Sequence, residues 1–305
     1  MARVLVLGGT GFIGSRLVVE LLAEGHEVTV FSRDAVDSRP RASGAIYVRG
    51  DFLDPREVGA VVREASHVFH LVSTTTPISS ADEAAVDVEQ NVMATLRLLN
   101  QCADARIEKV IFVSTGGAIY GHYPGRPLRE DDATYPVSPY AIGKLSIEGF
   151  LRFYRVSRGL DSMVFRISNP YGPGQAAAGG HGLIPTCIQR AMSGLPVTIF
   201  GDGLMVRDYV FVDDVARTLA TTFVKTTEHH TFNLGSGVGS SVTDIIAAVA
   251  SALGSDIGVD FQPARPTDVD RVILDVNRLR ETFKLEPATI DLPTGIARTV
   301  EAAHG

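Results

Sequence analysis

Residues 3–14 read RVLVLGGTGFIG, in which a continuous apolar run from Arg3 to Leu7 leads directly into Gly8-Gly-Thr-Gly11-Phe-Ile-Gly14. A continuous apolar run of this length is typical of a strand that is covered on both faces. Phe12 to Glu24 then shows helical periodicity, closed by Gly25. A strand, a glycine turn and a helix in this order predict a dinucleotide site, in which backbone N–H groups at the helix N-terminus hold a pyrophosphate. The alternative is a glycine turn that serves only close packing of the helix on the strand.

Length, composition and charge limit the number of domains and the class of ligand. The 305 residues are 45% hydrophobic, enough for one large core or two modest ones, and we expect two domains. A formal charge of -7 gives no basic surface for nucleic acid or anionic lipid, so we expect a small-molecule ligand. Cys102 and Cys187 have no metal-ligand neighbours and are interpreted as reduced core thiols; no metal site is predicted. No signal peptide or membrane-spanning run is visible, and a cytoplasmic location is the resulting expectation.

Strands alternate with helices through the first half of the chain. The patterns predict strands near 27–31, 45–48, 67–72, 109–113 and 162–167, and a long amphipathic helix over 82–103. This alternation predicts an α/β fold with a doubly wound parallel (Rossmann) sheet. We place the cofactor-binding domain at 1–171, with 208–235 returning to it, and a smaller α/β substrate domain at 172–305.

The end of the second predicted strand bears on the choice of cofactor. Dinucleotide sites usually place an acidic residue there to hold the adenosine ribose. This chain has Ser32-Arg33-Asp34, in which Arg33 could meet a 2'-phosphate or Asp34 could reach the ribose. The sequence therefore leaves NAD and NADP both open.

A second motif, Ser138-Pro-Tyr140-Ala-Ile-Gly-Lys144, begins a predicted helix. Four residues apart, Tyr140 and Lys144 share one helix face, so the ammonium could stabilise an ionised phenol and make Tyr140 a proton acceptor. The alternative is a surface tyrosine beside a solvated lysine. Ser114 and Thr115 end the fifth predicted strand, and either hydroxyl could meet the phenol over a substrate, or could bond its own backbone.

Two further polar residues, Asp51 and Asn91, have interpretations that involve no ligand. Asp51 could accept from an adenine amino group or act as a turn residue. Asn91 lies within the predicted helix over 82–103 and could be a polar-face residue.

Taken together, these motifs resemble the extended short-chain dehydrogenase/reductase family, and within it the nucleotide-sugar epimerases, such as the UDP-glucose 4-epimerases. The resemblance covers nearly the whole chain and is specific for the family, less so for the reaction. It is carried by GGTGFIG, Asp51-Phe52, Asn91, Ser114 to Gly121, Tyr140 with Lys144, Arg166 to Pro173, Gly201-Asp-Gly, Val206 to Tyr209, Asn233 to Gly237 and Arg265 to Asp268.

The resemblance implies a role for each matching residue. Tyr140 would be the general acid and base, Lys144 would lower its pKa and hold the nicotinamide ribose, and Thr115 would hydrogen-bond the sugar hydroxyl. Asn169 would bind the nucleotide sugar, Arg207 and Arg265 its diphosphate, and Asp268 the nucleotide ribose. The residues expected at the cofactor are Gly8, Gly11, Phe12, Ile13, Gly14, Ser32, Arg33, Asp51, Phe52, Leu71, Asn91, Tyr140 and Lys144.

The reaction expected from the resemblance is inversion of a hexose C4 hydroxyl of a UDP-sugar through transient hydride transfer to bound NAD. A rival is an NADPH-dependent nucleotide-4-keto-sugar reductase, which Ser32-Arg33 favours; a third interpretation is a non-catalytic dinucleotide-binding regulator. A dehydratase is disfavoured, because Gly116-Gly117 occupy the positions of its acid/base pair. Family members commonly form homodimers through two helices, here expected over 82–103 and 138–157.

Overall fold

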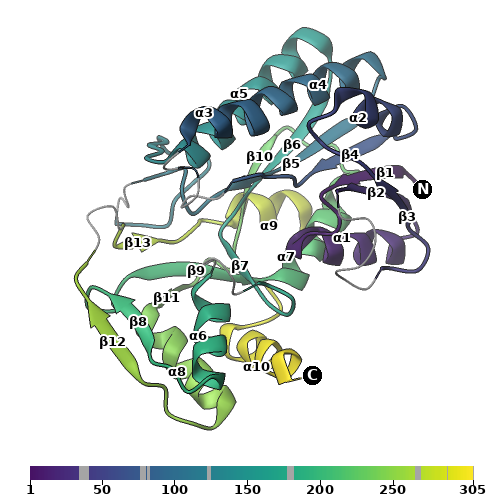
Figure 1. Cartoon of the computed structure of the whole chain (residues 1–305). Helices are drawn as coiled ribbons and strands as arrows, with labels where there is room; N and C mark the ends of the chain where they lie inside the picture. The colour runs from purple at the N-terminus through teal and green to yellow at the C-terminus, as the bar shows by residue number, and fades with distance from the viewer. Residues whose placement is uncertain are drawn as a thin grey trace. The chain divides into compact units, whose positions relative to one another are not determined.

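The computed structural model describes residues 1–33, 41–75, 80, 83–121, 125–176, 182–264, 269–286 and 288–304 (Figure 1). The chain forms two compact units whose segments alternate along the sequence. Unit 1 contains Met1–Gly121, Ala133–Arg166 and Ala216–Phe232; unit 2 contains His122–Asp132, Ile167–Val215 and Asn233–Gly305.

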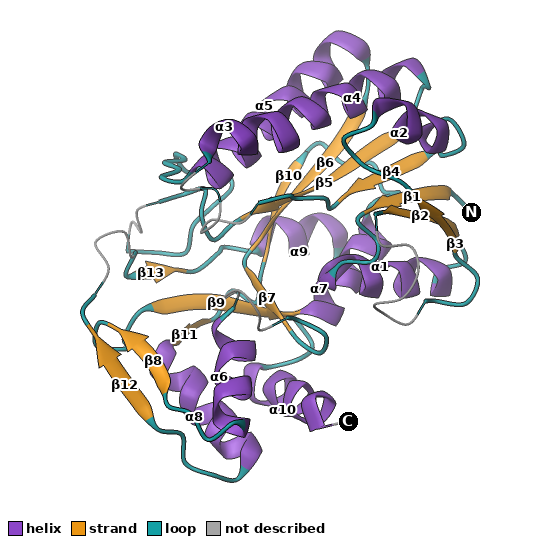
Figure 2. Ribbon diagram, in the orientation of Figure 1, coloured by secondary structure: helices purple, strands orange, loops and turns teal. Residues whose placement is uncertain are grey.

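A seven-stranded sheet forms the centre of unit 1, with helices beside it (Figure 2). Its strands are β1 (Arg3–Leu7), β2 (Glu27–Ser32), β3 (Ile46–Arg49), β4 (His67–His70), β5 (Lys109–Thr115), β6 (Asp161–Ile167) and β10 (Thr231–Leu234). The order is β3-β2-β1-β4-β5-β6-β10, and β1 pairs in parallel with β2 on one side and β4 on the other. The strand order therefore reverses beside β1, where open α/β sheets bind ligands at the carboxyl ends of their strands. This is the predicted Rossmann architecture.

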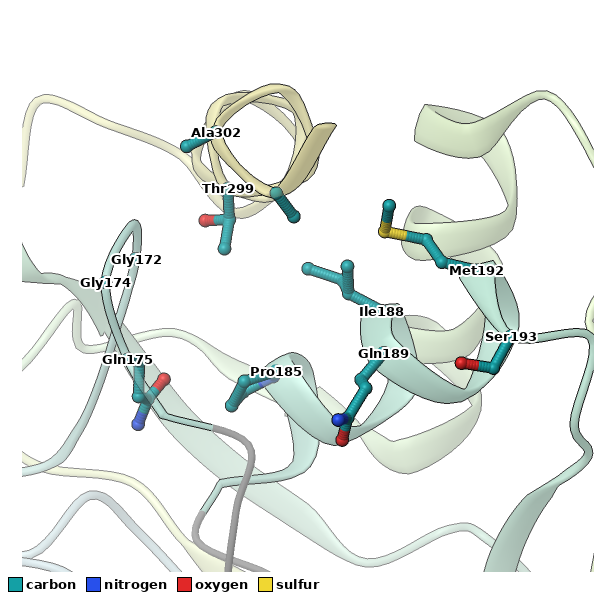
Figure 3. Close-up of a pocket in the computed structure, with 11 residues that line it drawn as sticks. Gly172, Gly174, Gln175, Pro185, Ile188, Gln189, Met192, Ser193, Thr299 and Ala302 are labelled. Atoms are coloured by element: carbon teal, nitrogen blue, oxygen red, sulfur yellow. The ribbon is translucent and has the colours of Figure 1, made fainter. Parts of the chain in front are cut away.

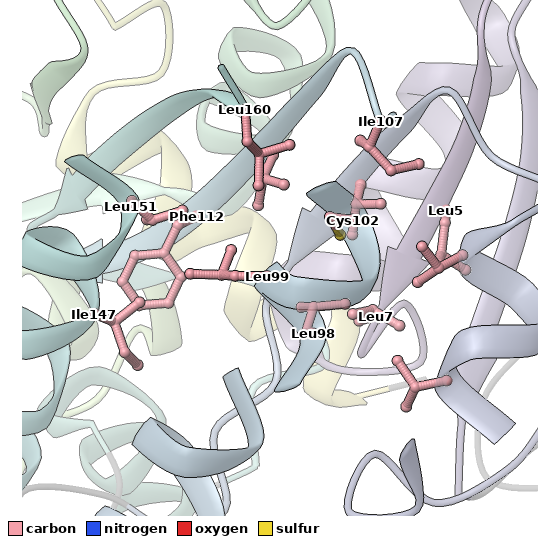
Figure 4. Close-up of a cluster of buried hydrophobic side chains, with 14 of the residues drawn as sticks. Leu5, Leu7, Leu98, Leu99, Cys102, Ile107, Phe112, Ile147, Leu151 and Leu160 are labelled. Atoms are coloured by element: carbon pink, nitrogen blue, oxygen red, sulfur yellow. The ribbon is translucent and has the colours of Figure 1, made fainter. Parts of the chain in front are cut away.

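The helices of unit 1 are α1 (Phe12–Ala23), α2 (Pro55–Val62), α3 (Ala84–Asp87), η1 (Val88–Met93), α4 (Ala94–Asp104) and α5 (Pro139–Arg158). The apolar stripes of α4 and α5 pack against the sheet and form one core with β1 and β5 (Figure 4). Leu99, Phe112 and Leu151 are among the buried side chains of this core. Cys102 also lies in it as a free thiol, and burial raises the pKa of that thiol.

The second predicted motif begins α5. Ser138 caps this helix by accepting from the Ala141 N–H at 3.3 Å, and Pro139 occupies the first turn. Gly159 ends the helix at a φ of 68°. These boundaries place Tyr140 in the first turn and Lys144 one turn later.

The helix predicted over 82–103 differs from the observed one. It consists of α3, a six-residue π-helix η1, and α4, with Asp82 outside the described residues. A π-helix closes hydrogen bonds five residues apart and is frequently found at functional sites. Amphipathic periodicity did not predict it, because one wider turn hardly disturbs the apolar stripe.

Unit 2 contains a four-stranded sheet built on β9 (Val206–Phe211), which pairs with β7 (Asn169–Tyr171), β11 (Gly239–Ser241) and β13 (Arg271–Val272). A separate parallel pair joins β8 (Val197–Phe200) to β12 (Val259–Gln262). The helices are α6 (Leu183–Met192), α8 (Val242–Leu253), α9 (Asn277–Phe283) and α10 (Leu292–His304). Ile188, Ile245 and Ile296 from three of these helices meet in the core of this unit.

Only part of 208–235 lies where the sequence predicted. Strand β10 joins the seven-stranded sheet, but β9 belongs to the sheet of unit 2, and α7 (Val212–Thr222) runs from one unit into the other. The apolar character of β9 indicated a buried strand without indicating which sheet would bury it.

Gly14 provides a test of the packing at the glycine turn. A Cβ on Gly14 would lie 2.3 Å from the Gly8 carbonyl oxygen, so Gly14→Ala must displace backbone. We expect a loss of unfolding free energy on the order of 3 kcal/mol, measured by urea denaturation. Gly59→Ala is the matched control, because its nearest contact is the flexible Gln101 side chain at 3.1 Å; it should change stability by about 1 kcal/mol or less. Equal stability of the two variants would contradict this packing.

Candidate functional site

The glycine turn forms an open helix N-terminus. Gly8 has a φ of 85°, and a Cβ on Gly9 would lie 2.8 Å from Val30. Helix α1 begins at Phe12 after Gly11, with no side-chain cap and no acidic residue in its first turn. The first N–H groups of a helix lack intrahelical partners and attract anions, so this turn, with Phe12 and Ile13, fits a dinucleotide pyrophosphate.

At the end of β2, the Ser32 hydroxyl is buried without a hydrogen-bond partner among the described residues. Arg33 is exposed, and Asp34 lies outside the described residues. A buried hydroxyl without a partner is unfavourable, and a ribose hydroxyl from a bound dinucleotide would satisfy it. Ser32 therefore fits the cofactor at the position where the sequence placed the ribose.

Three other residues expected at the cofactor have defined surroundings. The Asp51 carboxylate accepts from the Leu53 N–H at 2.9 Å, which is the turn role that the sequence left open. Phe52 is buried, with its ring centroid 5.1 Å from that of His70. Leu71 follows β4, where its N–H donates to the Leu7 carbonyl oxygen at 3.1 Å.

Asn91 is buried within η1 and does not lie on a polar face. Its Oδ1 accepts from the Thr74 N–H at 2.9 Å, and its Nδ2 donates to Thr75 Oγ1 at 3.0 Å and to Asp87 Oδ1 at 3.1 Å. Asn91 and Asp87 together hold the segment that follows β4. Their i, i+4 spacing was the only signal in the sequence for Asp87, which was not predicted as a site residue.

Lys144 is 6% exposed, and its ammonium donates to the Val113 carbonyl oxygen at 3.1 Å. The Nζ atom lies 4.8 Å from the Phe112 ring centroid and 5.6 Å from that of Tyr140. Burial lowers the pKa of Lys144 to about 8, while the carboxylates of Asp87 and Glu148 raise it. The alternative of a solvated lysine is therefore wrong.

The pKa of Tyr140 is shifted in the direction opposite to the one predicted. Burial, and after it the negative charge of Asp87, raise the pKa of Tyr140 to about 12, whereas the sequence led us to expect that Lys144 would depress it. Without further positive charge the phenol is protonated at neutral pH. The main-chain N–H of Tyr140 donates to Ser80 Oγ at 3.2 Å.

The two hydroxyls that end β5 differ in their partners. Ser114 is buried and donates to Glu148 Oε1 at 2.5 Å. The same carboxylate forms a buried ion pair with Arg166 at 2.7 Å, and Arg166 Nη1 donates to the Tyr120 hydroxyl at 2.9 Å. Thr115 is half-buried. Sequence patterns did not predict Glu148, although it lies one helix turn after Lys144.

In unit 2, Asn169 Nδ2 donates to the Asp208 carbonyl oxygen at 2.8 Å, and Arg207 Nη1 donates to the Val206 carbonyl oxygen at 2.9 Å. The Asp208 carboxylate is fully buried and accepts from the N–H groups of Ser236 and Leu274 at 2.8 and 3.3 Å. Burial raises the pKa of Asp208, and these hydrogen bonds lower it. Asp208 thus fixes the strand that carries Arg207. Arg265 and Asp268 lie outside the described residues.

A pocket of about 420 Å³ lies in unit 2 between α6, α10 and the turn at Gly172–Gln175 (Figure 3). Ile188, Met192 and Thr299 are among the side chains that line it, and none of the sequence-predicted site residues that the structure describes does so. None of the helices in the described parts of the chain is long and apolar enough to cross a membrane.

Comparison with known proteins places the chain in a family. A sequence profile of the NAD dependent epimerase/dehydratase family matches residues 4–235. A UDP-glucose 4-epimerase of Mycolicibacterium smegmatis is 35% identical over 98% of this chain and 97% of its own length. The chain therefore belongs to this family, the extended short-chain dehydrogenase/reductases, and is an NAD-dependent enzyme of the nucleotide-sugar epimerase type.

Two solved structures support the same assignment. The UDP-glucose 4-epimerase of Thermus thermophilus, solved in complex with NAD, has a TM-score of 0.92 and 36% identity, with 99% of each chain covered. The UDP-glucose 4-epimerase of Thermotoga maritima, solved with UDP-glucose, has a TM-score of 0.93 and 34% identity, covering 99% of this chain and 98% of that one.

Proposed function

We propose that the protein is a nucleotide-sugar 4-epimerase that inverts the C4 hydroxyl of a UDP-hexose. The observation that carries this proposal is the arrangement of Tyr140 and Lys144 on one turn of α5, with the buried ammonium 5.6 Å from the phenol ring centroid. The UDP-glucose 4-epimerases to which the chain is similar over nearly its whole length support the choice of reaction and of substrate.

NAD would be held by the open N-terminus of α1 and by Ser32, and would supply an acceptor that takes a hydride from C4 and returns it. Tyr140 would remove the proton of the C4 hydroxyl and give it back after the keto sugar has presented its other face. Lys144 would stabilise the phenolate that forms, because a hydrogen bond to the Val113 carbonyl oxygen holds its ammonium near the Tyr140 ring.

Thr115 is the hydroxyl that we propose for the sugar contact. The Ser114 proton is committed to Glu148, which also holds Arg166, so Ser114 has a structural role in a buried ion-pair network. Thr115 follows it at the carboxyl end of β5 and is half-buried, which leaves it the better placed of the two.

Asn169 and Arg207 are our candidates for binding the nucleotide diphosphate and sugar, with Arg265 and Asp268 proposed from sequence alone. An arginine matches phosphate oxygens in bidentate geometry, so Arg207 suits a diphosphate. The buried Asp208 beside it would fix the strand on which it binds.

The function is tested by incubating the purified protein with UDP-galactose, with no cofactor added. We expect UDP-glucose to form while the bound cofactor shows no net change in oxidation state, as followed by nucleotide-sugar chromatography and absorbance. Consumption of NADPH with a nucleotide-4-keto-sugar would instead establish the reductase. Binding without turnover of either kind of substrate would establish the non-catalytic regulator.

Tyr140→Phe removes the proposed proton acceptor while keeping the ring. Its kcat should fall by about 10²–10⁴-fold, the usual contribution of general acid–base catalysis, with little change in substrate affinity. Tyr154→Phe is the matched control in the same helix, because the Tyr154 hydroxyl donates to Asn100 at 2.8 Å, outside the proposed pair. Thr115→Val should behave like Tyr140→Phe. Activity at the level of the Tyr154 control would remove Tyr140 from the mechanism.

Helix α5 also carries an exposed apolar face, which we propose as a homodimer interface. Ile142, Phe150, Phe153 and Val156 are 49%, 36%, 58% and 82% exposed and lie within roughly a third of the helix circumference. Exposed apolar groups gathered on one helix are typical of association surfaces. The segment α3–η1–α4 packs alongside α5 and would extend this face.

Phe153→Glu tests the dimer. A charge at the centre of a buried apolar interface should convert the protein to a monomer, observed as a halved molar mass by light scattering after size exclusion. Val19→Glu, at an apolar residue of α1 that is 52% exposed, is the control and should leave the molar mass unchanged. A wild-type protein that is already monomeric would contradict the proposal.

A further inference from the structure

Asp87 has a buried carboxylate whose two oxygen atoms differ in their hydrogen bonding. It is 1% exposed, and its Oδ1 atom accepts from the Thr75 hydroxyl and from Asn91 Nδ2. Its Oδ2 atom has no hydrogen-bond partner among the residues that the structure describes. A buried carboxylate oxygen without a donor is strongly unfavourable unless a positive charge nearby offsets it.

The unpartnered oxygen lies against α5 at Gly143. A Cβ on Gly143 would be 2.7 Å from Asp87 Oδ2, closer than real side chains approach. A glycine inside an exposed helix costs about 1 kcal/mol relative to alanine, so the residue at this position serves the close approach of the carboxylate. Gly143 belongs to the helix turn that separates Tyr140 from Lys144.

We propose that Asp87 is a positioning residue whose buried carboxylate is the counter-charge that keeps the Lys144 ammonium charged beside Tyr140. The proposal rests on the function proposed for Tyr140 and Lys144, but it concerns their charge in the protein itself. Asp87 contacts neither the substrate nor the cofactor in this role.

Of the two carboxylates that raise the pKa of Lys144, Asp87 has the larger effect, and Glu148 is already engaged elsewhere. On α5, Glu148 is already paired with Arg166 of β6 at 2.7 Å and bonded to Ser114. From β4, His70 faces the same region, and burial lowers its pKa to about 3, so it is neutral. Strand β5 contributes the Phe112 ring and the Val113 carbonyl, which carry no formal charge. Tyr140 is protonated in this environment.

Removal of the carboxylate should shift both groups in the same direction. Asp87 raises the pKa of Lys144 against the effect of burial, so its loss should lower that pKa further below about 8. Asp87 also contributes to the raised pKa of Tyr140, so its loss should lower that pKa too. Ionisation of Tyr140 sets the acidic limb of the pH profile of kcat, and loss of the Lys144 charge sets the basic limb. Both limbs should therefore move to lower pH.

The charge of Lys144 can be measured directly, because the chain has only four lysines, Lys109, Lys144, Lys225 and Lys284. In protein labelled with carbon-13 at the lysine ε-carbon, the Lys144 signal is assigned by its loss in Lys144→Met and titrated by NMR without substrate. We expect its midpoint to fall by on the order of one pH unit in Asp87→Asn. This readout does not depend on catalysis, so it separates failure of this proposal from failure of the proposed function.

Two further variants complete the test. Asp87→Glu keeps the charge and should retain a midpoint nearer that of the wild type. Asp54→Asn removes a carboxylate that caps α2, accepting from the Arg56 N–H at 2.8 Å; it should lower stability without moving either pH limb.

If Asp87→Asn does not fold, Gly143→Ala provides the measurement, because its methyl group must displace the carboxylate. A Lys144 midpoint unchanged in whichever of these variants folds would overturn the proposal. So would a kcat that falls in Asp87→Asn with both pH limbs in place, since this is the behaviour of a purely structural residue.

Discussion

Burial of charge beneath α5 is the constraint on which the rest of unit 1 depends. Four charged side chains are buried there, those of Asp87, Lys144, Glu148 and Arg166. Charged groups withdrawn from water must find opposite charges or several hydrogen bonds. Arg166 and Glu148 satisfy each other, and Ser114 completes that pair. In our proposal, Lys144 and the Asp87 carboxylate, which lies against α5 at the neighbouring Gly143, offset each other's charge.

The fold was predictable because its signals are periodic and local. The apolar run of β1, the glycine turn and the stripe of α1 each follow from one rule, and the parallel order of the strands follows from their alternation with helices. The Tyr140–Lys144 spacing also predicted a shared helix face. Strand β9 could not be assigned to its sheet in the same way, since partner choice depends on contacts far apart in sequence.

The electrostatics of the site could not be predicted for a different physical reason. Spacing shows which side chains share a face, but a pKa depends on how much water each group has lost and on every charge around it. Asp87 lies more than fifty residues before Tyr140 in the chain, and it meets α5 at the point where α3 passes into η1. Lys144 was therefore expected to govern the phenol, while burial and Asp87 have the larger effects.

Because burial and Asp87 raise the pKa of Tyr140, this residue can act as a base only under certain conditions. With a pKa of about 12, Tyr140 holds its proton at neutral pH, and a carboxylate nearby makes ionisation harder still. In the proposed mechanism, a bound oxidised nicotinamide would add its positive charge to that of Lys144, which lies 5.6 Å from the Tyr140 ring centroid, and the phenol would act as a base only in that complex. Asp87 strengthens this dependence while keeping Lys144 charged. One buried carboxylate thereby restrains proton removal in the free protein and preserves the cation that assists it in the complex.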